Sequence, residues 1–305
     1  LAEERHAKVL AGGTDLLVNM KNRTEAPDIL VNLKSVPHLD FIRPDDGGFA
    51  IGALTPLKKI YSSREIWSKL PSLAQAASGV GSYHHQVMGT IGGNICQQNR
   101  CNYFNQSAGW HSARPKCLKM GGGMCHVVRN VSECFSCYHG ELAPLLMAMS
   151  ATVEVQGPEK KRVLPIENLF TGNGETPLAL SQGEILTMVR IPAKAVQGIS
   201  YYIKFADRGS IDFPVVGVAV WAVPAEGEYR VCFTAVDRRP VRANQVEDIL
   251  MGNHQDSKVL SQEEELCMKI GRPLRNTAFS PSYKRQVMKH LFNQAIRQVL
   301  GGSIH

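Results

Sequence analysis

The chain has 305 residues, of which 44% are hydrophobic and 20% charged, and its formal net charge is +7. This length can bury a substantial core and predicts two or three domains. No apolar run is long enough to span a bilayer, and the basic residues are spread along the chain without a recognition motif, so we expect neither a membrane nor a nucleic acid as a partner.

The first fifty residues alternate short apolar runs with turn residues. The runs are "AKVLAGGTDLL", "DILVNL" and "GFAIGALTPL", and they predict strands separated by a glycine turn and short helices. The segment from Leu57 to Gly79 is helical in character and is broken at Pro71. After it, "MGTIGGNI" predicts a second glycine-rich turn.

The middle of the chain follows a cysteine-rich segment. There "APLLMAMSATVEVQG" predicts a short helix and then a strand, and "KRVLPIENLF" continues the same module. The block "GEILTMVRIP" ends at Pro192 and is the best candidate for a domain boundary. Beyond it, "YYIKFADR", "FPVVGVAVWAV" and "YRVCFTAVDRRPVRA" predict the strands of a small sheet, which two helices follow.

The last predicted helix has clear ends. Ser280 with Pro281 is typical of a helix start, and Gly301 with Gly302 of a helix stop. Apolar residues recur at helical spacing between these ends: Val287, Met288, Leu291, Ala295, Ile296 and Leu300. We expect this stripe to pack against the sheet.

Two glycine pairs raise the question of a ligand. They lie in "LAGGTDLL" and in "TIGGN", some eighty residues apart. Adjacent glycines allow positive φ and let backbone N–H groups converge, which is a geometry that can seat a diphosphate. Neither pair belongs to a G-x-G-x-x-G motif or to a P-loop, and a single pair is usually only a tight turn. Two pairs together favour one shared anionic ligand.

Six of the eight cysteines fall between Cys96 and Cys137. Eight are too few for a disulfide scaffold in a chain of this length, and their clustering favours a metal or redox site in a reducing compartment. The opening "LAEERHAKVL" has charges where a signal peptide would be apolar. We therefore expect a cytoplasmic protein.

Five of these cysteines, at positions 101, 117, 125, 134 and 137, are separated by fifteen, seven, eight and two residues. Zinc sites usually show two close pairs, and only Cys134 with Cys137 forms one here. The wide spacings suit a loop that wraps around a larger object, such as an iron-sulfur cluster. The loop is also net positive, which stabilises thiolates. The residues favour a cluster and leave zinc or unligated thiols open.

Four motifs, "AGGTDLL", "MGTIGGNI", "GEILTMVRIP" and "YYIKFADR", resemble in this order the FAD-binding medium subunit of the molybdenum hydroxylases, the family of xanthine dehydrogenase and aerobic carbon monoxide dehydrogenase. The resemblance implies an α+β fold with α/β-like N-terminal lobes. It divides the chain into two FAD-binding lobes at residues 1–55 and 56–190, with an insertion at about 97–138, and a small α+β C-terminal domain at residues 191–305.

By position, the resemblance also implies a set of FAD-binding residues. The two glycine segments hold the diphosphate and ribityl chain, Val80 lies near the flavin, and Leu186 and Lys204 lie on its far side. Glu141 stands where many relatives carry Asp, and it reaches a ribose or adenine group. The full set is Leu10, Ala11, Gly12, Gly13, Thr14, Asp15, Leu16, Val80, Thr90, Ile91, Gly92, Gly93, Asn94, Glu141, Leu186 and Lys204. No catalytic residue is expected.

Most FAD subunits of this family have no insertion after "TIGGN". The β subunit of 4-hydroxybenzoyl-CoA reductase has one that carries a 4Fe-4S cluster on four cysteines, and it is the member that this chain resembles most. The positions that match its pattern are Cys101, Cys117, Cys125 and Cys134. The resemblance leaves Cys96 and Cys137 as packed thiols.

The resemblance implies an electron-transfer subunit of a complex that reductively removes the phenolic hydroxyl of 4-hydroxybenzoyl-CoA in anaerobic aromatic degradation. A ferredoxin-type donor would reduce the cluster, and electrons would pass through FAD to a 2Fe-2S small subunit and then to a molybdenum-cofactor large subunit. Two alternatives stand beside this function. One is the FAD subunit of another xanthine/CO dehydrogenase-type complex, and the other is a zinc-stabilised binding module with no redox role.

Overall fold

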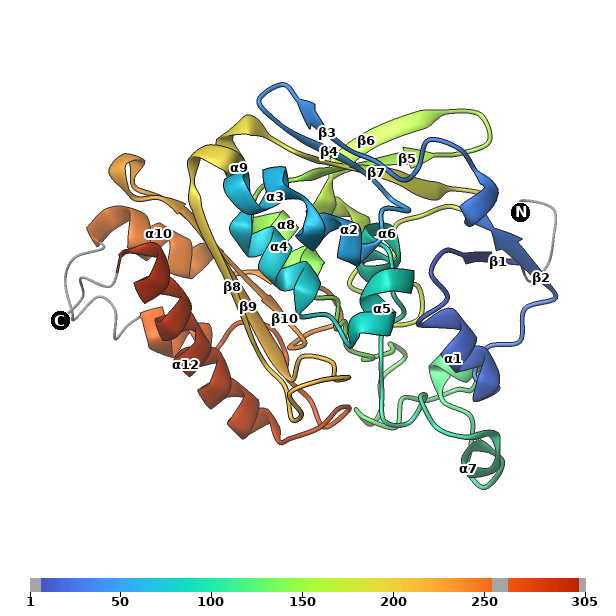
Figure 1. Cartoon of the computed structure of the whole chain (residues 1–305). Helices are drawn as coiled ribbons and strands as arrows, with labels where there is room; N and C mark the ends of the chain where they lie inside the picture. The colour runs from blue at the N-terminus through green and yellow to red at the C-terminus, as the bar shows by residue number, and fades with distance from the viewer. Residues whose placement is uncertain (1–6, 254–262, 302–305) are drawn as a thin grey trace.

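The computed structural model describes residues 7–253 and 263–301. They form three sheets with helices packed between and around them (Figure 1). The mixed α+β fold agrees with the expected class, whereas the expected divisions at residues 55 and 190 stay predictions. No helix of the described ranges combines the length and the hydropathy that a membrane crossing needs.

The N-terminal unit is small. Strand β1 (Ala7–Leu10) leads through a glycine turn into helix α1 (Leu16–Lys21), and β2 (Ile29–Asn32) then returns parallel to β1. Its buried apolar cluster is short and centres on Leu33, Leu39 and Leu54. With so little core of its own, this unit depends on its contacts with the rest of the chain.

A five-stranded antiparallel sheet forms the second unit, in the order β3-β4-β7-β5-β6. Its strands are β3 (Ile42–Asp45), β4 (Gly48–Gly52), β5 (Thr152–Gln156), β6 (Lys161–Pro165) and β7 (Ile185–Ile191). The sequence predicted β4 and β5 as strands, assigned β6 only to the module "KRVLPIENLF" and β7 only to the boundary block "GEILTMVRIP", and singled out no strand at β3, whose "IRPD" contains a proline and lacks a clear apolar alternation. Strand β3 lies at the edge of this sheet, and its edge position explains both the proline and the missing alternation.

Short helices occupy the space beside this sheet. They are α2 (Leu57–Ser62), α3 (Arg64–Lys69), α4 (Pro71–Ser78), α5 (Tyr83–Met88), α6 (Ile91–Ile95), α8 (Leu142–Ala148) and α9 (Ala193–Gln197). Helix α7 (Ala108–Ser112), in the cysteine-rich segment, lies apart from this sheet (Figure 1). The predicted break at Pro71 is confirmed, because Pro71 begins α4. A second break precedes α3, where the Ser63 hydroxyl accepts the N–H of Ile66 at 3.3 Å.

The C-terminal unit is a four-stranded antiparallel sheet in the order β11-β10-β9-β8, covered by two long helices (Figure 1). Its elements are β8 (Ile199–Phe205), β9 (Val216–Val223), β10 (Glu228–Thr234), β11 (Val241–Arg242), α10 (Asn244–Asn253) and α12 (Pro281–Val299). The predicted apolar stripe of α12 does pack on this sheet, and Ser280 caps the helix through the N–H of Tyr283 at 3.2 Å. Gly302 lies outside the described residues.

The two glycine pairs behave differently. Gly13 has a φ of +74° in a true turn, as predicted. The expected second turn is wrong: Gly92 and Gly93 lie in helix α6, where the Thr90 hydroxyl accepts the N–H of Gly93 at 3.0 Å. A Cβ on Gly92 would lie 2.8 Å from the Ala53 carbonyl oxygen. The glycine there permits close packing rather than a change of chain direction.

The larger units share one buried core. It runs from Ile51 on β4 through Leu145 on α8 to Trp221 on β9, and each of these side chains is fully buried. An ion pair spans the same junction: Lys204 Nζ on β8 lies 2.9 and 2.8 Å from the two carboxylate oxygens of Glu141, which precedes α8. Burial raises the pKa of Glu141 to about 7, and the nearby Lys204 opposes the rise.

This junction yields a prediction for stability. Lys204→Met leaves the Glu141 carboxyl buried without its cation, and we expect the free energy of unfolding at pH 8 to fall by about 2 kcal/mol, less than for a fully buried pair because Lys204 is partly exposed. Adding Glu141→Gln should recover most of the loss, because the buried charge is then gone. Urea denaturation of the four proteins measures the cycle, and additive losses would refute the coupling.

The raised pKa of Glu141 gives a second expectation. The folded protein binds this proton more tightly than the unfolded chain, so the contribution of Glu141 to stability should be greatest below about pH 4.5 and fall as the pH rises toward 7. Urea midpoints of wild-type protein and Glu141→Gln between pH 5 and 8 test the sign. A wild-type slope that the substitution leaves unchanged would assign the titration to other groups.

Candidate functional site

Two cavities meet along the glycine segments, with volumes of about 110 and 330 Å³. The residues that line both are Thr14, Asp15, Gly89, Thr90, Gly93 and Gln97. Glycine brings the two walls together here, because a Cβ on Gly12 would lie 2.2 Å from the Met88 carbonyl oxygen. The joined cavities form one elongated site. The narrow part where they meet, lined by the six shared residues, is called the waist, and the elongated shape suits a dinucleotide better than a compact ligand.

The larger cavity is mostly apolar. The first glycine turn forms one wall, and leucines from several connecting segments and from β7 form the other: Leu33, Leu54, Leu178, Leu180 and Leu186. Leu178 and Leu180 come from the segment between β6 and β7, which no motif singled out. A planar apolar ring fits between such walls.

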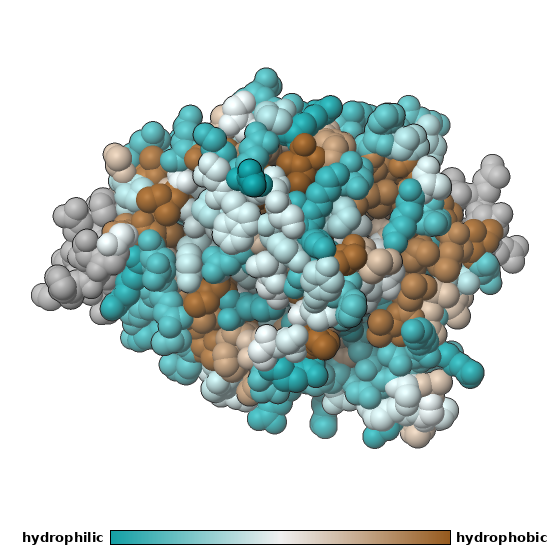
Figure 2. Space-filling model, viewed as in Figure 1, coloured by the Kyte–Doolittle hydropathy of each residue, from teal (hydrophilic) through white to brown (hydrophobic). Residues whose placement is uncertain are grey.

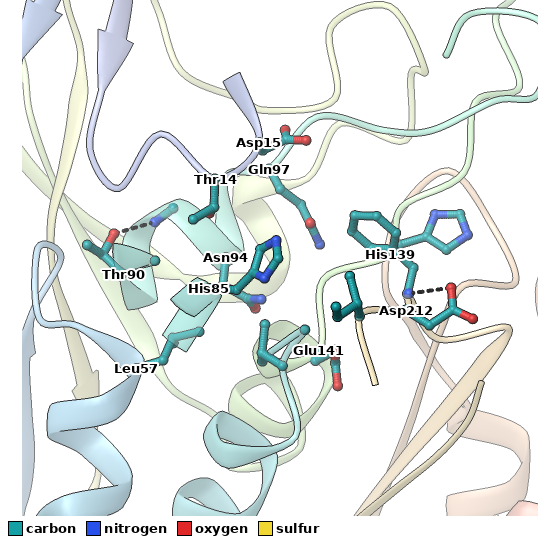
Figure 3. Close-up of a pocket in the computed structure, with 16 residues that line it drawn as sticks. Thr14, Asp15, Leu57, His85, Thr90, Asn94, Gln97, His139, Glu141 and Asp212 are labelled. Carbon is teal, nitrogen blue, oxygen red and sulfur yellow. Dashed lines mark hydrogen bonds between the residues drawn. The ribbon is translucent and has the colours of Figure 1, made fainter. Parts of the chain in front are cut away.

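The smaller cavity draws residues from all three units. Val80, His85 and Asn94 come from the helical segment, and Glu141 from the start of α8. The loop after β8 supplies Ile211, Asp212 and Phe213. Figure 3 shows the labelled side chains arranged around this space, with Gln97 and His85 pointing toward it from different segments. The cavity therefore exists only in the assembled fold.

Most residues of the predicted set line one of these cavities. They are Ala11, Gly12, Gly13, Thr14, Asp15, Leu16, Val80, Thr90, Gly92, Gly93, Asn94, Glu141 and Leu186. Three do not: Leu10 lies in β1, Ile91 is fully buried in the core, and Lys204 reaches the site only through its ion pair with Glu141. The binding role of each residue stays a prediction.

Gln97 was missed by the sequence analysis. Its amide nitrogen is buried and has no hydrogen-bond partner among the described residues, yet Gln97 lines both cavities. A buried donor without a protein acceptor is costly unless a ligand or water accepts its proton. Gln97 follows α6 without any distinguishing motif, so only the folded structure could identify it.

Asp15 connects the first glycine turn to the cysteine-rich segment. Its carboxylate accepts the Gln98 backbone N–H at 3.0 Å and a hydrogen bond from the Arg100 guanidinium at 3.0 Å. The same guanidinium lies 4.0 Å from the ring centre of Phe213, which lines the smaller cavity. A single arginine thus contacts the glycine turn and the C-terminal unit.

The cysteines separate into two groups. Cys101, Cys117, Cys125 and Cys134 are all buried and line one small cavity, together with Phe104, Leu118, Lys119 and Phe135. Cys137 faces another way, with its sulfur 3.2 Å from the Asp237 carbonyl oxygen, and Cys96 lines the larger of the joined cavities. The structure brings together the four predicted cysteines and leaves out the two that were expected to be packed thiols.

The four thiols do not form a single-ion site. Within the part of the chain that the structure describes, no three His, Cys, Asp or Glu side chains are grouped to hold one metal ion. Burial raises the pKa of Cys101 to about 11 and also raises that of Cys117, while the backbone N–H groups of Tyr103 and Phe104 act against the rise at Cys101 and those of Lys119 and Met120 act against it at Cys117.

Four buried thiols from separate segments surround one space, and they have the donor set that an iron-sulfur cluster uses.

Comparison with known proteins gives a consistent result. Residues 1–194 match the model of the FAD binding domain in molybdopterin dehydrogenase, and residues 201–299 match that of the CO dehydrogenase flavoprotein C-terminal domain. The aldehyde oxidoreductase FAD-binding subunit PaoB of Escherichia coli is 32% identical over 246 residues, which cover 77% of this chain and 76% of that protein. The nicotinate dehydrogenase FAD-subunit of Eubacterium barkeri is 25% identical, covering 96% and 90%.

Solved structures show the same fold. A carbon monoxide dehydrogenase from Hydrogenophaga pseudoflava superposes with a TM-score of 0.79 at 23% identity, covering 97% of this chain and 90% of that one. Quinoline 2-oxidoreductase from Pseudomonas putida gives a TM-score of 0.73 at 21% identity, covering 98% and 91%. The two domain models together span nearly the whole chain, and the chain belongs to the FAD-binding subunit family of the molybdenum hydroxylases of the CO and xanthine dehydrogenase type.

Proposed function

We propose that this chain is the FAD-binding electron-transfer subunit of a xanthine/CO dehydrogenase-type complex, and that its insertion holds a 4Fe-4S cluster. The observation that carries the proposal is the pairing of two sites in one fold: an elongated glycine-lined cavity, and a separate cavity bordered by four buried cysteines. Bound FAD and a cluster supply one- and two-electron redox chemistry, and the chain positions them and sets their surroundings.

FAD fits the elongated cavity at both ends. The apolar leucine walls suit the adenine, the glycine waist suits the diphosphate, and the smaller cavity beside Val80 and His85 suits the flavin ring. The unpartnered amide of Gln97 at the waist supplies a donor for a ligand oxygen. This assignment places Leu186 at the adenine end rather than beside the flavin.

The partners follow from the family. The relatives are named as medium chains or FAD subunits, so we propose a hetero-oligomer with a molybdenum-cofactor large subunit and a 2Fe-2S small subunit. Figure 2 shows apolar side chains at the edge of the molecule that carries β1 and β2. Val9, Ile29 and Leu30 are more than a third exposed there, and partner subunits commonly cover such patches. A ferredoxin-type donor and a cytoplasmic location stay proposals.

For the substrate of the complex, we propose only the class of reaction. By their names, the relatives reported above act on an aldehyde and on nicotinate, which favours an oxidative complex over a reductive one. The cysteine insertion favours a second candidate, a 4-hydroxybenzoyl-CoA reductase-like complex, because the sequence resemblance to that enzyme rests on this insertion. The zinc-stabilised binding module is not supported, since the family is a flavoprotein family and the four cysteines do not form a single-ion site.

The purified protein tests the proposal directly. We expect a flavin absorption spectrum with a broad shoulder near 400 nm, and about four iron and four acid-labile sulfide per chain. Flavin without iron would leave a plain FAD subunit and refute the cluster. Zinc without flavin would refute both parts.

Gly93 offers a test of the flavin site that spares the fold. Its added Cβ would meet only the Thr90 hydroxyl, at 3.1 Å, and Gly93 lines both cavities, so Gly93→Val should block the waist and reduce flavin content to near zero. Gly92→Val is a poorer test, because its side chain would strike the Ala53 backbone.

The matched control is Gly109→Val in the exposed helix α7, where an added Cβ meets nothing within 4 Å. It should keep its flavin, as measured by absorbance of the protein after gel filtration, with circular dichroism to confirm folding. Full flavin in a folded Gly93→Val protein would place the cofactor elsewhere.

The cysteine assignment makes a paired prediction. Cys117→Ser removes a thiol from the cavity and should lose the cluster iron while keeping FAD, whereas Cys137→Ser lies outside that cavity and should keep both. Iron and flavin analysis of each variant decides between them. Loss of the cluster in Cys137→Ser alone would mean that Cys137 is a ligand in place of one of the four.

A further inference from the structure

We propose that Lys119 provides the positive charge that balances the thiolates of the cysteine cavity and thereby raises the reduction potential of the cluster. This inference rests on the cluster proposed above and adds a role for a residue that does not ligate it. Three observations support it. The Lys119 ammonium is held beside the cysteine cavity, it has no carboxylate partner among the described residues, and the other basic residues of the insertion are exposed or already paired.

The position of Lys119 is fixed from both ends. Lys119 lines the same cavity as the four cysteines and lies two residues after Cys117 in the chain. The ammonium donates to the Asn99 carbonyl oxygen at 2.8 Å and lies 4.7 Å from the ring centre of Phe104. The side chain therefore turns inward over the cavity instead of extending into water.

Lys119 has no carboxylate partner among the described residues. The groups that would act on it most strongly when ionised are the thiols of Cys134 and Cys101, ahead of Glu25 and Asp15. Those two carboxylates already have cations, because Glu25 pairs with Lys8 at 3.5 Å and Asp15 with Arg100 at 3.0 Å. An ammonium held this way needs a counter-charge, and four thiolates on a cluster carry net negative charge.

The effect on the cluster follows from electrostatics. Reduction adds an electron, so a nearby cation that is only partly exposed to water stabilises the reduced state more than the oxidised one and raises the reduction potential. The Asn99 carbonyl that holds the ammonium belongs to the segment that contacts Asp15 on the first glycine turn. The charge is thus held on the side of the cluster cavity that adjoins the flavin site.

The other basic residues of the insertion provide the contrast. Arg100 is paired with Asp15, and Arg114, Lys116 and Arg129 are exposed, so water and salt screen their charges. Lys116 is the closest match to Lys119: it has the same charge, lies in the same loop and is adjacent to Cys117 in the chain. Lys116 is exposed and does not line the cysteine cavity, which makes it the control.

The experiment measures cluster potential and not turnover. Lys119→Met keeps the apolar stem but removes the charge, Lys119→Arg keeps the charge, and Lys116→Met removes an exposed charge from the same loop. Each full-length protein is purified, its iron, sulfide and FAD are counted, and its cluster is titrated with dithionite and followed by electron paramagnetic resonance. We expect a lower midpoint potential in Lys119→Met and values near wild type in Lys119→Arg and Lys116→Met.

Several outcomes separate this inference from the proposed function. A cluster-loaded Lys119→Met with wild-type potential, or equal shifts in Lys119→Met and Lys116→Met, would overturn the role of Lys119 while the cluster stands. If Lys119→Met assembles no cluster but Lys119→Arg does, the charge is needed for assembly and the inference holds. If Lys119→Arg fails as well, shape and not charge is required, and the inference falls. Wild-type protein without iron would remove the proposed cluster itself.

Discussion

The two candidate sites depend on the hydrogen bond and the ion pair that the Asp15 carboxylate makes with the segment before the cysteine loop. The carboxylate accepts the Gln98 N–H and the Arg100 guanidinium, each at 3.0 Å, and so fixes the first glycine turn against the chain that leads into the cysteine loop. The N-terminal unit has a small core and cannot hold that turn by packing alone. Because Cys101 follows Arg100 directly, the position of the cysteine cavity relative to the glycine turn is set by the same ion pair.

The insertion can be accommodated because its ends lie side by side. Arg100 and Cys137 exchange two backbone hydrogen bonds of 2.7 Å, so the chain leaves and returns at one point between the glycine segments and α8. A loop closed this way adds residues at a modest entropic cost and leaves the sheets unchanged. It is also anchored to the C-terminal unit, where the Asn102 N–H donates to the Asn276 carbonyl oxygen at 2.7 Å and the Tyr138 N–H to that of Asp237 at 3.0 Å.

The sequence was informative wherever a local pattern determines structure. Apolar runs located β4 and β5 of the five-stranded sheet and the strands of the C-terminal sheet, and Ser280 with Pro281 located the start of α12. The sequence was not informative for residues whose structure depends on contacts with distant parts of the chain. The "TIGGN" glycines read as a turn because their partner, the Ala53 backbone, is forty residues away. Gln97 and the loop of Ile211 to Phe213 gained their place only through packing between units. The cysteine spacing alone did not decide between a cluster, zinc and unligated thiols. The direction in which each thiol points depends on how the loop folds.

The cysteine loop and the flavin site differ in how they balance the negative charge of the group that each is proposed to bind. In the proposed assignment, the FAD diphosphate would meet glycines that clear space and an amide donor without a protein partner, while the ionised side chains nearby stay paired with one another. A cluster would bring its negative charge on the protein's own thiolates, and Lys119 is the residue that we propose supplies positive charge from outside the ligand set. The Asn99 to Cys101 segment belongs to both sites, since Asn99 holds the Lys119 ammonium and Arg100 holds Asp15. These three consecutive residues therefore join the glycine turn to the cysteine cavity.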